Sequence, residues 1–181
     1  MKKVVVLLMA VAVLAMVVSS FAQDAKFKYI GVAKCKMCHK GEKKGSIFEK
    51  WQQTTHAKAY ETLTTDAALE VAKKAGVKGE PQNAKECLVC HVTGYDAAKE
   101  PTLTLEEGNS CEACHGPGSE YKSLKIMKGI YDGTMKGADY GLIEPTKEVC
   151  VKCHNPKSPT YKEFKFEEAV KKIAHPLPKA E

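Results

Sequence analysis

The 181-residue chain contains no arginine, and all 28 of its basic residues are lysine. The guanidinium group of arginine is the usual side chain for phosphate and base recognition, so its absence argues against a nucleic-acid partner. The formal net charge of +6 is spread along the chain, which is typical of solvated lysine faces. Phenylalanine and tryptophan are also scarce, with five residues and one residue respectively. The chain therefore has little material for an extensive hydrophobic core.

Long apolar runs are absent except near the N-terminus, where residues 4–18 follow two lysines. Ser20 and Ala22 then supply small residues at the two positions that a signal peptidase reads. The run is short for a membrane span, which favours a cleaved signal peptide over a retained anchor. We expect a signal peptide over residues 1–22 and one exported, periplasmic domain over residues 23–181, without stable membrane insertion.

All eight cysteines occur in four copies of the pattern C-x-x-C-H. Two thiols at this spacing can add to the two vinyl groups of one haem, and the histidine that follows reaches the iron. Two zinc sites or four redox disulfides would use the same cysteine pairs, but neither needs the histidine. We expect four c-type haems, held by the first motif (Cys35, Cys38, His39), the second (Cys87, Cys90, His91), the third (Cys111, Cys114, His115) and the fourth (Cys150, Cys153, His154).

So many haems in so short a chain must themselves form most of the core. The predicted fold class is therefore mostly α with extensive loops, a multihaem cytochrome c wrapped around four covalently bound haems. Periodicity predicts helices over residues 46–63, 66–76 and 160–174, and one or two helical turns within 119–127. Ser46 and Glu49 suggest a capping box for the first helix, and Asp66 a cap for the second. Residues 93–110 and 129–141 are expected to be loops, and no strand is predicted.

Two histidines, His56 and His175, remain after the four in the motifs. His56 lies within the predicted helix over residues 46–63, and His175 follows the predicted helix over residues 160–174. A solvent-facing histidine and a histidine in a frayed tail are the alternatives to iron ligation. The number of haems favours ligation, so we expect both to be distal iron ligands. At least two haems must then have another sixth ligand or none.

Five stretches, "YIGVAKCKMCH", "WQQTTHAKAYETL", "CLVCHVTGY", "CEACHGPGSE" and "FKFEEAVKKIAH", together resemble the cytochrome c-554 family of periplasmic tetrahaem electron carriers. They follow the family order and span nearly all of residues 29–175. The resemblance implies that His56 pairs with His115 and His175 with His154. It also implies that the haem on His91 is five-coordinate.

The sequence departs from the family after "CHGPG", where members carry a histidine that is the distal ligand of the first haem. Tyr121 stands in that stretch here. The haem on His39 is then open or water-bound, or takes Met127 or Met135, or takes another ligand such as Tyr121 or a lysine. A methionine ligand would raise its reduction potential.

These features favour a periplasmic electron carrier over an enzyme, with other cytochromes or multihaem oxidoreductases as its redox partners. Two alternatives remain from the residues alone. An open haem could bind a small ligand and reduce nitric oxide, hydroxylamine or peroxide. The chain could also be one subunit of a cytochrome filament.

Overall fold

The computed structural model describes residues 26–175, so the predicted signal peptide lies outside the described residues. Within that range the chain has no strand, and an isolated parallel bridge joins Tyr29 to Lys99. No helix in the same range has the length and apolar character needed to cross a membrane. The expectation of a mostly α fold with extensive loops is confirmed.

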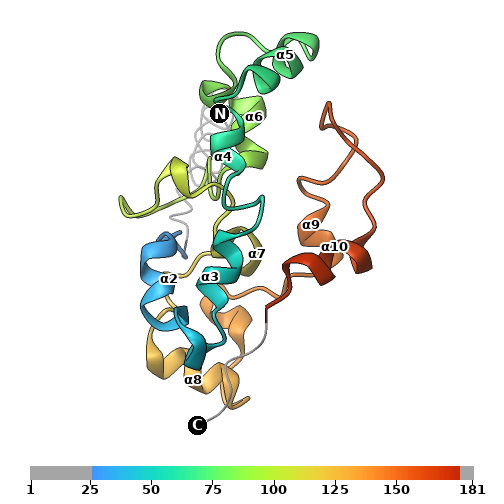
Figure 1. The fold of residues 1–181 in the computed structure, drawn as a ribbon. Coiled ribbons are helices and arrows are strands. Elements are labelled where there is room, and N and C mark those ends of the chain that lie inside the picture. The colour runs from blue at the N-terminus through green and yellow to red at the C-terminus, as the bar shows by residue number, and fades with distance from the viewer. Residues whose placement is uncertain (1–25, 176–181) are drawn as a thin grey trace, which may run out of the picture.

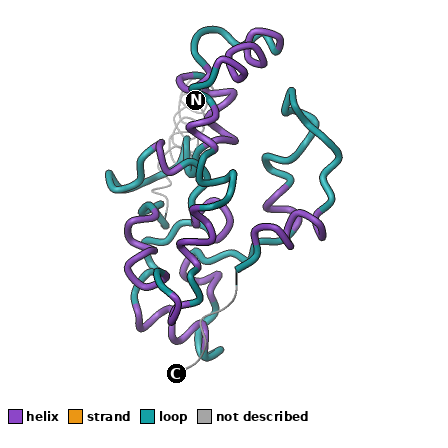
Figure 2. Tube along the Cα trace, viewed as in Figure 1, coloured by secondary structure: helices purple, strands orange, loops and turns teal. Residues whose placement is uncertain are grey.

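Short helices and single turns alternate along the chain. The α-helices are α2 (Val32–His39), α3 (Ile47–Gln52), α4 (Ala59–Thr62), α5 (Asp66–Lys74), α6 (Lys85–His91), α7 (Cys111–His115), α8 (Leu124–Tyr131), α9 (Lys147–Cys150) and α10 (Phe166–Ile173). The 3-10 turns are η1 (Glu42–Lys44), η2 (Pro81–Asn83), η3 (Leu105–Glu107) and η4 (Gly137–Tyr140). Figure 1 shows α5 and α8 at opposite ends of the molecule, with α9 and α10 to one side. Loops join all of these elements, as Figure 2 shows.

Residues 46–63 do not form one continuous helix, so this prediction is wrong. The stretch is divided into α3 and α4 by turns over residues 53–58. Ser46 has a φ of 49° and does not cap α3, while Glu49 accepts hydrogen bonds from the Gly41 amide at 3.1 and 3.2 Å. At the other end, the Thr54 hydroxyl donates to the Trp51 carbonyl at 2.7 Å, which draws that carbonyl away from a continuing helix.

The other predicted helices exist with shifted boundaries. Thr65, and not Asp66, caps α5, because its hydroxyl accepts from the Ala68 amide at 3.2 Å. The turns expected within residues 119–127 begin later as α8 and continue into a stretch that was predicted to be loop. The last helix is shorter than predicted, and α10 ends two residues before His175.

The hydrophobic core is small. Leu63, Leu88 and Val92 form one buried cluster between α4 and α6, and Tyr60 and Leu105 pack against it. This cluster is far too small to organise the whole chain by apolar burial alone.

Asn109 connects the segments that carry the second and third motifs. Its carbonyl accepts from the Trp51 indole at 2.9 Å, and its side-chain amide donates to the Cys90 carbonyl at 2.8 Å. Its own backbone N–H donates to the His56 carbonyl at 2.9 Å. One residue therefore positions α3, the turn that holds His56, and the end of α6 relative to the start of α7.

Candidate haem-binding sites

Each C-x-x-C-H motif begins on a short helix. The first three motifs end α2, α6 and α7, whereas the fourth starts in α9 and is completed by the turn after it. Residues at i, i+3 and i+4 share one side of a helix, so both thiols and the histidine of each helical motif can face one porphyrin. No disulfide joins any two of the eight cysteines. Within the described range, no three His, Cys, Asp or Glu side chains gather as a metal-binding group.

His91 is oriented by a hydrogen bond to the backbone. Its Nδ1–H donates to the Ala59 carbonyl at 2.7 Å, because a carbonyl can only accept. The remaining nitrogen, Nε2, is then the one left free for a metal. This bond joins α4 to α6 and fixes the orientation of the second-motif imidazole.

Four histidines form two pairs, each with ring centroids 5.9 Å apart. The pairs are His56 with His154, whose rings are nearly perpendicular at 88°, and His115 with His175, at 48°. Metal–nitrogen bonds of about 2 Å on each side would hold two coplanar or crossed imidazoles with centroids roughly 6 Å apart. Both pairs therefore have the separation that one iron between them requires.

The pairing implied by the family resemblance is wrong in this structure. His56 lies against His154 of the fourth motif, and His175 lies against His115 of the third. The break between α3 and α4 places His56 in a turn that reaches the fourth motif. The end of α10 in turn delivers His175 to α7.

Burial favours the neutral, metal-binding form of His56 and His115. It lowers the pKa of His56, with a further lowering from the adjacent His154. It also lowers the pKa of His115, with further contributions from His175 and then His39. The third-motif histidine therefore lies near both His175 and the first-motif histidine.

Phe164 is a site residue to which sequence analysis assigned no role. Its ring stacks on His154 with centroids 4.7 Å apart and an angle of 16°. The histidine itself is exposed, so Phe164 supplies much of the apolar surface on its ring. Phe164 falls within the helix predicted over residues 160–174, although the structure places it in the segment that precedes α10.

Tyr121, which replaces the family histidine, is buried, with 8% of its surface exposed. Its hydroxyl donates to the Gly116 carbonyl at 2.7 Å. Burial and then the neighbouring carboxylate of Glu112 raise the pKa of Tyr121 far above its usual range, so the phenol stays neutral. The hydroxyl proton is engaged by the turn that follows the third motif.

The two candidate methionine ligands lie on or beside α8. Met127 is half-buried on the inner side of that helix, together with Ile126 and Ile130. Met135 packs on the helix backbone, since its sulfur lies 2.7 Å from where a Cβ on Gly129 would stand.

Thiols of different motifs lie close enough to perturb one another. Cys35 and Cys111 are within hydrogen-bonding reach, as are Cys153 and Cys90, while Cys114 and Cys150 are near enough to interact electrostatically. Burial and the nearby Cys90 thiol raise the pKa of Cys153 to about 12. These contacts place the motifs in the spatial order first, third, fourth, second, which differs from their order in the sequence.

A carboxylate inside the third motif binds the segment that precedes the first motif. Glu112 Oε1 accepts from the amides of Ile30 at 3.0 Å and Gly118 at 2.6 Å. Its Oε2 accepts from Ile30 at 3.0 Å and from Gly31 at 2.8 Å. Sequence analysis missed this residue, although a glutamate between two cysteines and before a Gly-Pro-Gly turn was a visible signal.

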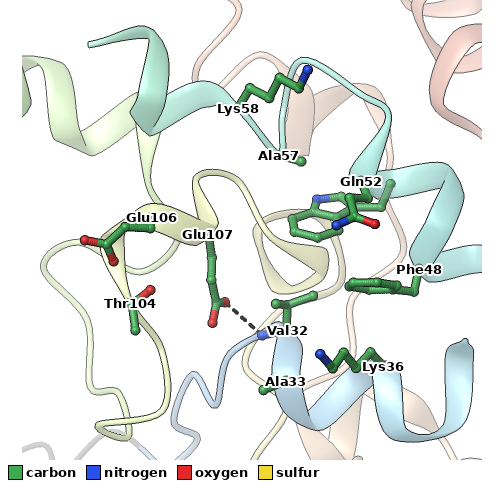
Figure 3. Close-up of a pocket in the computed structure, with 11 residues that line it drawn as sticks. Val32, Ala33, Lys36, Phe48, Gln52, Ala57, Lys58, Thr104, Glu106 and Glu107 are labelled. Carbon is green, nitrogen blue, oxygen red and sulfur yellow. Dashed lines mark hydrogen bonds between the residues drawn. The ribbon is translucent and has the colours of Figure 1, made fainter. Parts of the chain in front are cut away.

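Glu107 supports the same helix from the neighbouring turn. Figure 3 shows its carboxylate accepting from the Val32 amide, at 2.8 Å, beside a cavity of about 370 Å³ on the flank of α2. Lys36 extends over the Phe48 ring on the other side of this cavity, with 5.6 Å from Nζ to the ring centroid. Together Glu107 and Glu112 fix the start of the helix that presents Cys35 and His39.

These residues fit c-type haems. The paired histidines have the separation of iron ligands, and the small apolar core leaves the motifs to be covered by something other than protein. The Nδ1 atoms of His39 and His175 are buried and have no hydrogen-bond partner within residues 26–175. A haem at each motif would supply the apolar surface and the iron that the chain itself lacks.

Comparison with known proteins agrees with this geometry. The sequence profile of the family "Cytochrome c554 and c-prime" matches residues 34–116. Cytochrome c-554 of Nitrosomonas europaea is 31% identical over 193 aligned positions, which cover 85% of this chain and 76% of that protein. The structure of reduced cytochrome c554 from the same organism matches with a TM-score of 0.59 and 29% identity, covering 83% of this chain and 86% of that one. The chain therefore belongs to the cytochrome c-554 family, and it is a c-type cytochrome that carries electrons on four c-type haems.

Proposed function

We propose that this chain passes electrons between redox proteins in the periplasm, along four motifs arranged in the order first, third, fourth, second. The observation that carries this proposal is the set of thiol contacts between motifs, which joins all four into one row. The haems supply one-electron chemistry when bound, and the chain supplies their ligands, burial and spacing. Export to the periplasm is supported by the predicted signal peptide over residues 1–22.

The two middle members of the row are the motifs with a second histidine. His115 pairs with His175 and His154 with His56, so each of these two irons would have two histidine ligands. Such sites suit rapid transfer, because little must move when an electron arrives. The first and second motifs, at the ends of the row, are then the places where electrons enter and leave.

The surface around the first motif favours an acidic redox partner. Residues 26–50 contain eight lysines and two glutamates, and Lys34, Lys36 and Lys40 are exposed around the motif. Met37, inside the motif, is 77% exposed and offers an apolar centre to this lysine-rich face. A partner with surface carboxylates would be steered here by charge, and its association rate would fall as salt increases.

For the haem on His39, the hydroxyl of Tyr121 is a poor ligand because it donates to Gly116. Met127 is the better methionine candidate, since α8 begins three residues after Tyr121 and Met127 lies on its inner side. The sulfur of Met135 is instead packed on Gly129. The alternative is an iron without a sixth protein ligand.

Electron paramagnetic resonance of the fully oxidised protein tests this assignment, with ferric spins counted per four haems. One high-spin and three low-spin irons would support Met127 ligation and a pure electron carrier. Two of each would mean that the His39 and His91 haems are both open, which would favour reduction of nitric oxide, hydroxylamine or peroxide. Fewer than two low-spin irons would contradict the proposed histidine pairs. A Met127→Leu variant is the matched control, because it should change the count only in the first case.

A further inference from the structure

Two carboxylates lie where the first and third motifs meet. Glu112 is buried, with 1% of its surface exposed, and Glu107 is half-buried beside it. Glu112 is part of the third motif and binds the amides just before α2, whereas Glu107 binds the first amide of α2 itself. Both side chains are therefore fixed parts of the junction between these two motifs.

The geometry around Glu112 is that of an ionised carboxylate. Backbone N–H groups donate to both of its oxygens, so a proton on either oxygen would face a donor. Burial raises the pKa of Glu112, and the N–H groups of Gly118, Gly31 and Ile30 oppose that rise. None of the ion pairs within residues 26–175 involves Glu107 or Glu112. The negative charge is thus held by amides and not by a lysine.

This charge is close to the attachment points of two haems. The Cys35 thiol donates to the Gly31 carbonyl at 3.7 Å, next to the amide that binds Glu112. Both glutamates act electrostatically on the thiols of Cys35 and Cys111. Glu86 and Glu148, the carboxylates that act on Cys87 and Cys150 in the other two motifs, are exposed and are therefore screened by water.

We propose that Glu112 and Glu107 lower the reduction potentials of the first and third haems. A ferric iron carries one more positive charge than a ferrous iron, so a nearby unscreened carboxylate stabilises the oxidised state. Each transfer moves one electron between irons, with no bond formed or broken, from a redox protein at one end of the row to another at the far end. Because the carboxylates near the fourth motif are exposed, this charge favours electron transfer from the third motif to the fourth. The inference rests on the proposed function, because it uses the motif order given there.

The test is a redox titration of the holoprotein followed by electron paramagnetic resonance. Perpendicular imidazoles give a low-spin ferric signal with a large maximum g value, and less steeply crossed imidazoles give an ordinary rhombic signal. The angles of 88° and 48° therefore separate the fourth haem from the third in one spectrum. The variants are Glu112→Gln and Glu107→Gln, with the exposed neighbour Glu106→Gln as the matched control.

In Glu112→Gln we expect the equilibrium constant for reduction of the rhombic, third-motif haem to rise roughly tenfold, which is about 59 mV for one electron. Glu107→Gln should shift the same signal in the same direction. The large-g signal of the fourth haem, and both signals in Glu106→Gln, should change less than about twofold. A residue that only supports the fold would not move one potential selectively.

Unchanged third-haem potentials in folded variants with four haems would overturn the inference. Glu112→Gln places an amide against N–H donors and is the variant more prone to lose haem. If it does, Glu107→Gln decides alone, because Glu107 accepts from a single amide and its oxygen can be replaced by that of glutamine. Failure of the proposed function would be seen separately, as absence of the two low-spin signals from the unmodified protein.

Discussion

Replacement of His56 by alanine is expected to abolish the low-spin ferric signal with the large maximum g value and to add one high-spin iron per protein. The reason is that His56 and His154 form the perpendicular pair. Without His56 the fourth iron would have His154 as its single protein ligand, and a five-coordinate ferric haem is high-spin. The potential of that haem should rise as well, because a neutral, electron-rich ligand to ferric iron is removed. Spectra of the oxidised variant at low temperature provide the measurement.

The matched variant is His175→Ala, which should remove the rhombic signal and leave the large-g signal in place. A chain lacking the fourth haem, with Cys150 and Cys153 replaced by serine, distinguishes the two pairings directly. In that background His56→Ala should cost no further low-spin iron. Loss of a second low-spin iron in that background would instead support the His56–His115 pairing that the family resemblance implied.

Replacement of Gly116 by alanine should be among the most damaging changes to stability. Gly116 has a φ of +78°, and a Cβ there would lie 2.5 Å from the Gly141 carbonyl oxygen. The left-handed conformation costs a non-glycine residue about 1–2 kcal/mol, and the backbone contact cannot be relieved by rotating a side chain. We expect the free energy of unfolding in urea to fall by about 3 kcal/mol in total.

Gly133→Ala is the control for that experiment. Its φ of +72° is similar, but a Cβ there would meet nothing within 4 Å. It should therefore lose only the conformational part, about 1–2 kcal/mol. Equal losses of unfolding free energy in the two variants would contradict this prediction. They would show that the backbone after the third motif can move away from Gly141 to accommodate the added methyl group.

The site could be predicted from the sequence wherever chemistry fixes local spacing. Four C-x-x-C-H motifs and the count of six histidines identify the haems and the two candidate distal ligands without any knowledge of the fold. The partner of each distal histidine could not be obtained in this way. That depends on whether residues 46–63 form one helix, and the hydrogen bonds of Glu49 to Gly41 and of Thr54 to Trp51 divide them. Contacts of this kind compete with helix periodicity and leave no pattern in the sequence.

Glu112 illustrates a second reason for the same difficulty. It lies between the two cysteines of the third motif, yet its hydrogen-bond partners Ile30 and Gly31 lie about 80 positions earlier in the sequence. Binary patterning predicts an exposed charge at such a position, because it does not register amides from a distant segment. The structure buries the residue because those amides replace water.

The order of the motifs in space determines which segment of the chain completes the row of haems. The first and third motifs meet through Cys35 and Cys111, and the second joins this row through the fourth, at Cys153 and Cys90. In this arrangement the segment of the fourth motif supplies the haem-to-haem junction between the first and third motifs and the second. A variant truncated before residue 147 could hold three haems and still lack a path for electrons from the third haem to the second.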